Sequence, residues 1–339
     1  MKTLLLTIIS FFTFSQIFSQ TDSARFYFKK GTDEETAKRY LLSSKYFDKA
    51  ISFDPNYIDA YIENGRVNIE MRKIFLAKGY FEKAYKLQPE NTIVIKELSS
   101  LYFNERQFQK AIDLAQKCKS CPDAERIMAM SSYHMEDYVK AVAGLEKYLS
   151  KNPNDAEATY TLGRSYLELE DNKNAIRQYQ KALTLDPTKS VWMYELALQL
   201  YNSNDFANAK KYFVMAGEAG YPKSNDFYEN LGFAYINTGE IDNGLKNLTI
   251  VLSRKPNNKE LLNDIAQALY SAKHYEEALS YYQKLLELNP KDANSLYMAG
   301  ITFQKMGQKE KGIAMCDEAI KIDPALAKNR QKKGDQFGL

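Results

Sequence analysis

The segment Ala156–Pro187 reads AEATYTLGRSYLELEDNKNAIRQYQKALTLDP and decides the fold. Its apolar residues recur at helical spacing in two stripes, the first through Leu162 and Tyr166 and the second through Ala175 and Tyr179. A polar Glu-Asp-Asn turn separates the two stripes. The segment therefore predicts two antiparallel helices joined by a short turn.

The same unit recurs along the chain. The nine prolines fall in one series with spacings of 31 to 35 residues, at Pro55, Pro89, Pro122, Pro153, Pro187, Pro222, Pro256, Pro290 and Pro324. Two columns of small residues keep this period, one including Gly65 and Gly163 and the other including Ala77 and Ala175. Because a proline ring ends a helix and small residues let helix backbones approach closely, these registers predict about nine stacked units.

The pattern resembles the tetratricopeptide repeat. The family signature of Trp-x2-Leu-Gly-x2-Tyr, Ala-x3-Phe and Pro is matched in the fifth unit by Leu162, Gly163, Tyr166, Ala175, Tyr179 and Pro187. The resemblance implies an all-α fold, a right-handed α-solenoid of tandem antiparallel helix pairs. We expect the array at residues 20–324 and a C-terminal capping helix at 325–339, since the last unit of a solenoid needs a polar cover.

One unit is short. Ala111 and Ala141 occupy equivalent column positions but lie 30 residues apart, whereas most units repeat after 34. Four residues make about one helical turn. We therefore expect the second helix of the third unit to lack one turn, next to Cys118 and Cys121.

Composition excludes several classes of function. The 46 basic and 43 acidic residues leave a formal net charge of +3, so we expect no nucleic-acid partner. Two histidines and three cysteines are too few for most zinc or multi-histidine sites, so we expect no metal and no cofactor. No nucleophile, base and orienting group converge in any register, and the sequence predicts that the protein is not an enzyme.

The first residues have the pattern of an export signal. Lys2 is the only charged residue before Asp22, and an apolar run from Leu4 to Phe14 follows it. Because this run is shorter than the roughly 20 residues that span a bilayer, it predicts a secretory signal peptide at residues 1–19, with an uncleaved anchor as the alternative. The first cysteine, Cys118, is far from the cleavage site, so we expect no lipid anchor. We also expect no transmembrane segment after signal removal and an exported protein, periplasmic or extracellular.

Cys118 and Cys121 form a Cys-x-x-Cys pair at the end of the shortened helix. Zinc would need two more ligands at matching spacing, and haem attachment would need a histidine where Pro122 stands. The dipole at a helix C-terminus disfavours a thiolate. In an oxidising compartment we expect a structural disulfide, with free thiols or a redox pair as the alternatives.

The family resemblance also implies where a partner binds. In tetratricopeptide arrays the first helix of each unit lines a concave groove that holds an extended peptide or a partner helix. Carried over to this chain, the groove residues are Arg126, Tyr133, Tyr160, Arg164, Tyr194, Tyr201, Asn230, Phe233, Asn237, Asn263 and Tyr270. Aromatic rings supply contact area, and amides can pair with the main chain of a peptide. Tyrosines that only pack between neighbouring helices are the alternative.

These observations predict a non-enzymatic, exported scaffold. It is expected to bind a protein or an extended peptide in the groove, as part of a cell-envelope assembly or secretion complex. The alternative is a glycan- or peptidoglycan-binding module that uses the tyrosine-rich groove as a stacking platform.

Overall fold

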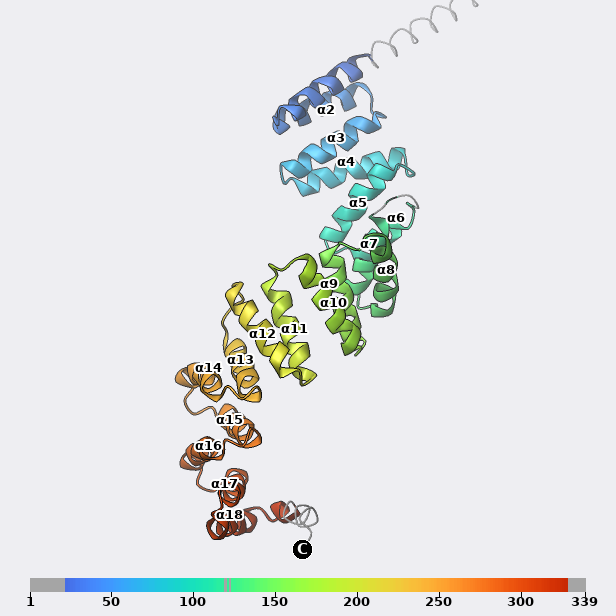
Figure 1. Ribbon diagram of the computed structural model, residues 1–339. Helices are drawn as coiled ribbons and strands as arrows, with labels where there is room; N and C mark the ends of the chain where they lie inside the picture. The colour runs from blue at the N-terminus through green and yellow to red at the C-terminus, as the bar shows by residue number, and fades with distance from the viewer. Residues whose placement is uncertain (1–21, 119–120, 122, 329–339) are drawn as a thin grey trace, which may run out of the picture. The chain divides into compact units, whose positions relative to one another are not determined.

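The computed structural model describes residues 22–118, 121 and 123–328. Within these residues the regular structure is helical and contains no strand. Consecutive helices form antiparallel hairpins (Figure 1), and within each unit neighbouring helices pack against one another, as α3 does on α4 and α17 on α18. The predicted all-α solenoid of tandem helix pairs is therefore confirmed. The chain divides into two units, residues 1–178 and 179–339, and each unit is described by itself.

Unit 1 opens with a helical segment at residues 22–36. The helices that follow are α2 (Tyr40–Phe53), α3 (Ile58–Glu70), α4 (Ile74–Leu87), α5 (Thr92–Asn104), α6 (Phe108–Ala115), α7 (Ala124–His134), α8 (Tyr138–Lys151) and α9 (Ala156–Glu168), and α10 (Asn172–Leu185) crosses the unit boundary. Phe81, Ile95 and Leu98 are among the buried side chains that join α4 to α5.

Unit 2 continues the same construction. Its helices are α11 (Ser190–Asn202), α12 (Phe206–Glu218), α13 (Asn225–Asn237), α14 (Ile241–Arg254), α15 (Lys259–Ser271), α16 (Tyr275–Leu288), α17 (Ala293–Lys305) and α18 (Lys309–Ile322), followed by the short 3-10 helix η1 (Pro324–Leu326). Leu248, Ile265 and Tyr282 are fully buried in its core.

Residues in the left-handed backbone conformation follow the first helix of several hairpins. The backbone φ angle is 59° at Arg72, 62° at Glu136 and 60° at Glu170. Equivalent turns in unit 2 carry Gly239 and Gly307, with φ angles of 84° and 85°. This conformation suits glycine and costs other residues roughly 1–2 kcal/mol, so several turns hold strain that the sequence pattern did not reveal.

The columns of small residues lie where paired helices cross. A β-carbon added at Gly65 would lie 2.7 Å from the ring of Phe81, and one added at Gly244 would lie 2.8 Å from the carbonyl oxygen of Gly232. Neither separation leaves room for a larger side chain. The close helix approach that the columns predicted is therefore confirmed.

The third unit of the repeat is shortened as predicted. α6 spans eight residues, whereas α4 and α8 span 14 residues each. A pocket of about 500 Å³ opens at the C-terminal end of α6, with Ala115, Met128 and Lys147 in its lining. The missing turn thus leaves part of α7 and α8 without cover from the preceding helix.

A buried polar cluster joins α2 and α3 in unit 1. The Nδ2 of Asn64 donates to Asp48 Oδ1 at 2.8 Å, and the Oγ of Ser44 donates to Asn64 Oδ1 at 2.7 Å. Asn68 Nδ2 donates to the Asn64 carbonyl oxygen at 2.8 Å. The equivalent positions in the fifth unit carry Leu162 and Tyr166, so hydrogen bonds replace apolar packing at Asn64 and Asn68.

Two predicted segments fall at the ends of the chain. The predicted signal peptide at residues 1–19 lies outside the described residues. Of the predicted capping helix at 325–339, the described part comprises the end of η1 and two helical residues, 327 and 328, and the rest lies outside it. No helix in the described ranges combines the length and the apolar character needed to span a bilayer.

Candidate functional site

The predicted groove residues lie on the first helices of the hairpins. In unit 1 they belong to α7 and α9, and in unit 2 to α11, α13 and α15. A cap fixes the start of several of these helices. The Asp155 carboxylate begins α9 by accepting from the Ala158 N–H at 2.9 Å, and Ser224 and Asn258 cap α13 and α15 in the same way.

Arg126 on α7 contacts the start of α9. Its Nε donates to Asp155 Oδ2 at 2.7 Å, and its Nη2 donates to Glu157 Oε2 at 2.6 Å. The hydroxyl of Tyr148 also donates to Asp155 Oδ2, at 3.1 Å. Although burial acts in the opposite direction, the hydrogen bonds from Ala158 and Arg126 lower the pKa of Asp155. Arg126 therefore joins neighbouring hairpins as well as lying on the predicted surface.

The structure brings Tyr133, Tyr160 and Arg164 together. The guanidinium carbon of Arg164 lies 5.5 Å from the ring centroid of Tyr133 on α7 and 6.0 Å from that of Tyr160 on its own helix, α9. All three side chains are half-buried. This Tyr133–Tyr160–Arg164 cluster combines two aromatic faces with a planar cation, groups that can stack on a partner or bind its carboxylates.

In unit 2 the tyrosines and asparagines of the predicted groove bond to one another. Asn230 Nδ2 donates to the Tyr194 hydroxyl at 2.7 Å, and Asn237 Nδ2 donates to the Tyr201 hydroxyl at 3.0 Å. Each pair joins α11 to α13. Both amides thus already donate within the fold, and a peptide main chain would have to use their remaining donor or acceptor capacity.

Tyr194 also differs from an open groove position. Its exposed fraction is 8%, its ring stacks on Tyr221 with centroids 4.1 Å apart, and it packs at a tilt against Phe213 with centroids 5.4 Å apart. Its ring belongs to the packing between α11 and the connection before α13. The sequence pattern could not indicate this, since Tyr221 lies in the irregular segment that precedes α13.

The remaining predicted residues lie on α13 and α15. Phe233 and Tyr270 pack, partly buried, against the same apolar cluster, and Asn263 is half-buried. Carboxylates lie on the same two helices: burial, Asp226 and Asp264 raise the pKa of Glu229, and Lys255 acts against this shift. This part of unit 2 thus carries carboxylates that repel one another.

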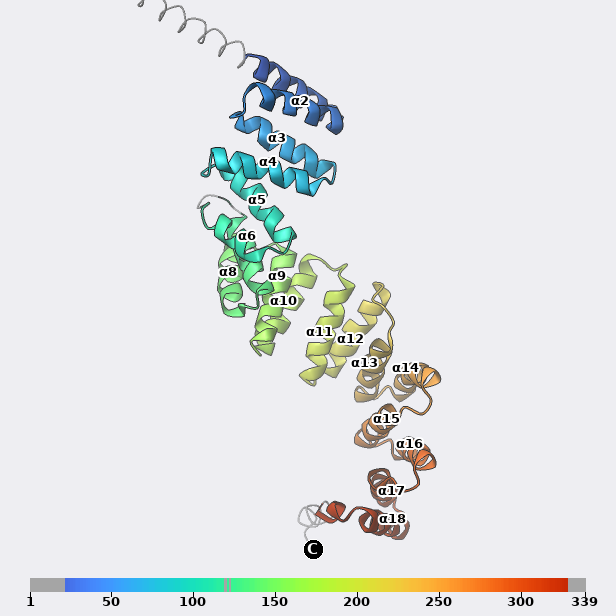
Figure 2. The same ribbon diagram turned by 180° about the vertical axis from the view of Figure 1, so that it is seen from behind.

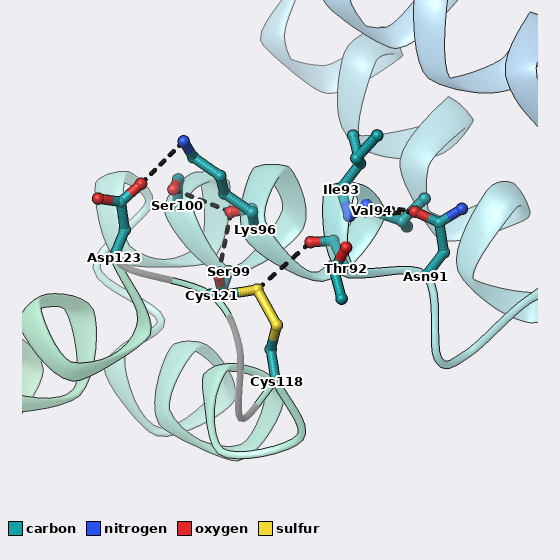
Figure 3. Close-up of a disulfide and its surroundings, with 10 residues drawn as sticks. All are labelled: Asn91, Thr92, Ile93, Val94, Lys96, Ser99, Ser100, Cys118, Cys121 and Asp123. Atoms are coloured by element: carbon teal, nitrogen blue, oxygen red, sulfur yellow. Dashed lines mark hydrogen bonds and ion pairs between the residues drawn. A yellow bond between two sulfur atoms is a disulfide. The ribbon is translucent and has the colours of Figure 1, made fainter.

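Cys118 and Cys121 are joined by a disulfide, with their Cα atoms 5.4 Å apart. It connects the end of α6 to the segment that leads into α7 (Figure 3). The Cys121 Sγ lies 3.5 Å from the Thr92 carbonyl oxygen, and the nearby Lys96 pairs with Asp123 at 2.8 Å. In the described part of the chain, no cluster of three or more histidines, cysteines or carboxylates has the arrangement of a metal site.

A family model described as tetratricopeptide repeat matches residues 156–189 and 259–292, and a second model of the same description matches residues 281–314. The first two matches begin at α9 and α15 and each cover one hairpin.

Curated relatives and solved structures are similar to the chain at low identity. The CTR9 homolog of Arabidopsis thaliana is 22% identical over 352 residues, which cover 90% of this chain and 31% of that protein. Anaphase-promoting complex subunit 3 of Schizosaccharomyces pombe is 21% identical over 274 residues, which cover 76% of this chain and 41% of that protein. The chain thus spans less than half the length of either relative. The crystal structure of YrrB, described as a TPR protein with an unusual peptide-binding site, is 25% identical, with 56% of this chain and 97% of that chain covered and a TM-score of 0.42.

Proposed function

Because the chain carries tetratricopeptide repeats, we propose that it is a non-catalytic scaffold that holds a protein partner or an extended peptide on the first helices of its hairpins. Repeats of this kind serve as interaction modules, and one relative is by name a subunit of a multiprotein complex. For this chain, binding of a partner and membership of an assembly are proposals, because the chain matches only part of these longer proteins.

The Tyr133–Tyr160–Arg164 cluster is the observation that carries this proposal. Tyrosine and arginine are the residue types that dominate binding energy at protein interfaces, because they present large, rigid surfaces with polar ends. Here neighbouring first helices hold all three together, half-buried, in one unit. A partner that stacks on the rings gains contact area without ordering flexible side chains.

The carboxylates on α13 and α15 suggest the chemistry of the segment that reaches unit 2. Burial and the charges of Asp226 and Asp264 disfavour the ionised form of Glu229. A lysine or arginine from a partner would relieve this repulsion. We therefore propose that the partner segment bound by unit 2 is basic.

A pull-down tests the proposed function. Wild-type protein and a Tyr160→Ala, Arg164→Ala variant are used to capture partners from envelope extract, with Tyr85→Ala as control because Tyr85 is half-buried on α4, a second helix of the same unit. Loss of two anchor residues should weaken capture at least about tenfold, while the control captures like wild type. Equal capture by wild type and the cluster variant would contradict the proposal.

Export to the cell envelope is part of the proposal and rests on the pattern of residues 1–19. Intact-mass measurement of the protein from its native envelope should show a chain that begins near Gln20. A mature chain that retains Met1 would contradict export by cleavage.

The alternative function, binding of glycan or peptidoglycan, is favoured by the same two tyrosine rings. Titration with purified wall fragments separates the alternatives. Saturable binding that depends on Tyr133 and Tyr160, together with a pull-down that captures no protein, would favour glycan binding.

A further inference from the structure

Two successive turns of unit 1 share a composition that the later turns lack. Residues 38–42 read Lys-Arg-Tyr-Leu-Leu, and the equivalent residues 72–76, one repeat later, read Arg-Lys-Ile-Phe-Leu. The corresponding stretch at 136–140 reads Glu-Asp-Tyr-Val-Lys, and the one at 170–174 reads Glu-Asp-Asn-Lys-Asn. We call residues 38–42 and 72–76 the basic edge.

The apolar residues of the basic edge face solvent. The exposed fraction is 80% for Phe75, 59% for Leu41 and 49% for Leu76. Because these residues occupy equivalent places in neighbouring repeats, they recur at the pitch of the solenoid. Figure 1 and the reverse view in Figure 2 both place the turns before α2 and α4 at the same edge of unit 1. Exposed apolar residues gathered in this way mark an interaction surface.

The basic residues stand where they do not favour the local fold. Arg39 and Lys73 are the N-cap residues of α2 and α4, and neither makes a side-chain cap hydrogen bond. A positive charge at a helix N-terminus opposes the helix dipole. At the equivalent place before α8, Asp137 accepts a hydrogen bond from the Lys140 N–H. The second helices α6, α14, α16 and α18 also begin without a side-chain cap, so the feature that distinguishes the basic edge among second helices is the positive charge at two helix N-termini.

Little negative charge neutralises this edge. Arg39 pairs with Glu34, but within the described residues no ion pair involves Lys38, Arg72 or Lys73. Glu70, although close in sequence, acts on Glu35 of the first helical segment at residues 22–36. The edge thus presents cations beside exposed apolar side chains.

We propose that the basic edge binds the surface of a lipid bilayer that contains anionic headgroups. Leu41, Phe75 and Leu76 would enter the boundary between headgroups and acyl chains, and Lys38, Arg72 and Lys73 would contact lipid phosphates. Apolar side chains flanked by cations are complementary to a negative surface with an apolar interior. The surface is distinct from the first-helix cluster, so this inference goes beyond the proposed function and does not rest on it.

Co-sedimentation of the full chain with vesicles tests the proposal. The vesicles contain either phosphatidylcholine with phosphatidylglycerol or phosphatidylcholine alone. One variant, Leu41→Asp with Phe75→Asp, removes the apolar contacts, and a second, Arg72→Gln with Lys73→Gln, removes charge. Val139→Asp is the matched control, since Val139 is 68% exposed at the position equivalent to Phe75 but follows Glu136 and Asp137.

Wild type should bind the anionic vesicles more strongly than the neutral ones, and added salt should weaken binding because it screens surface charges. Both edge variants should bind the anionic vesicles at least roughly tenfold more weakly, since each basic residue near such a surface contributes about 1 kcal/mol. The control should bind like wild type. The proposal would be overturned by wild type that stays in solution, by edge variants that bind like wild type, or by a control that loses as much binding as they do. If the wild-type protein does not bind vesicles but captures a protein partner in a way that depends on Phe75, the basic edge is a protein-docking surface instead.

Discussion

At the scale of single residues, Tyr282 in unit 2 has a buried hydroxyl without a hydrogen-bond partner among the described residues. Burial, with a smaller effect of Tyr270, raises the pKa of this hydroxyl to about 12. A buried hydroxyl that loses its bonds to water costs roughly 1–3 kcal/mol. Tyr282→Phe should therefore increase the free energy of unfolding by about 1 kcal/mol, measured by urea denaturation.

Tyr80 supplies the control for this prediction. Its hydroxyl donates to Asp48 Oδ1 at 2.7 Å, so Tyr80→Phe removes a hydrogen bond to a carboxylate and should lower the free energy of unfolding. If Tyr282→Phe destabilised the protein as much as Tyr80→Phe, the hydroxyl of Tyr282 would have to make a hydrogen bond in solution.

Asp155 gives unit 1 a dependence on pH. A pKa that is lower in the folded state than in the unfolded state means that the folded state favours the carboxylate. Its contribution to stability is therefore present above the ordinary pKa of 3.8 and is lost as the pH falls through the lowered value. Asp155→Ala should lower the free energy of unfolding at neutral pH by about 1–2 kcal/mol, because it removes a helix cap and leaves Arg126 with one fewer partner.

The difference between Asp155→Ala and wild type should shrink as the pH falls below about 4. Urea denaturation at neutral and acid pH checks this. A difference that stays constant over that range would show that the carboxylate charge of Asp155 does not contribute to stability.

At the scale of single elements, replacing a glycine by alanine should change the free energy of unfolding in opposite directions in a turn and within a helix. Gly239 closes α13 with a φ angle of 84°, and a β-carbon added there would meet no atom within 4 Å. Gly239→Ala should thus test backbone strain alone and should lower the free energy of unfolding by about 1 kcal/mol.

Gly79→Ala is the matched substitution within a helix. Gly79 lies in α4, and a β-carbon added there also meets no atom within 4 Å. Since alanine is the better helix former, this change should increase the free energy of unfolding by roughly 0.5–1 kcal/mol. The same sign for both glycine substitutions in thermal or urea denaturation would contradict the assignment of Gly239 to a left-handed turn.

Much of the fold was predictable from the sequence because it depends on local and periodic features. The proline series and the small columns record where helices end and where they cross, and the missing four residues predicted the short α6. Contacts between hairpins were less predictable. The bond from Asn230 to Tyr194 joins residues 36 apart, and the ring of Tyr194 is buried by Tyr221 from an irregular connection. Such contacts depend on how helices are rotated, which the repeat pattern does not record.

At the scale of the whole molecule, stability is distributed over hairpins and their contacts with neighbours. Surface residues can therefore change without unfolding the array, provided that they do not join hairpins. In unit 1 this separates two surfaces. The Tyr133–Tyr160–Arg164 cluster lies on first helices, whereas the basic edge lies at the turns before α2 and α4. Two surfaces on different elements would let one unit hold a partner while the other surface contacts a bilayer.

The central claim, that first helices hold the partner, is tested most directly by site-specific photo-crosslinking in the native host. A photoreactive phenylalanine replaces either Tyr160 on α9 or Tyr85 on α4, so that the two probes differ in the helix type that carries them. We predict a discrete crosslinked partner from position 160 and none from position 85. A partner crosslinked from position 85 and not from position 160 would contradict the claim and assign binding to the second helices.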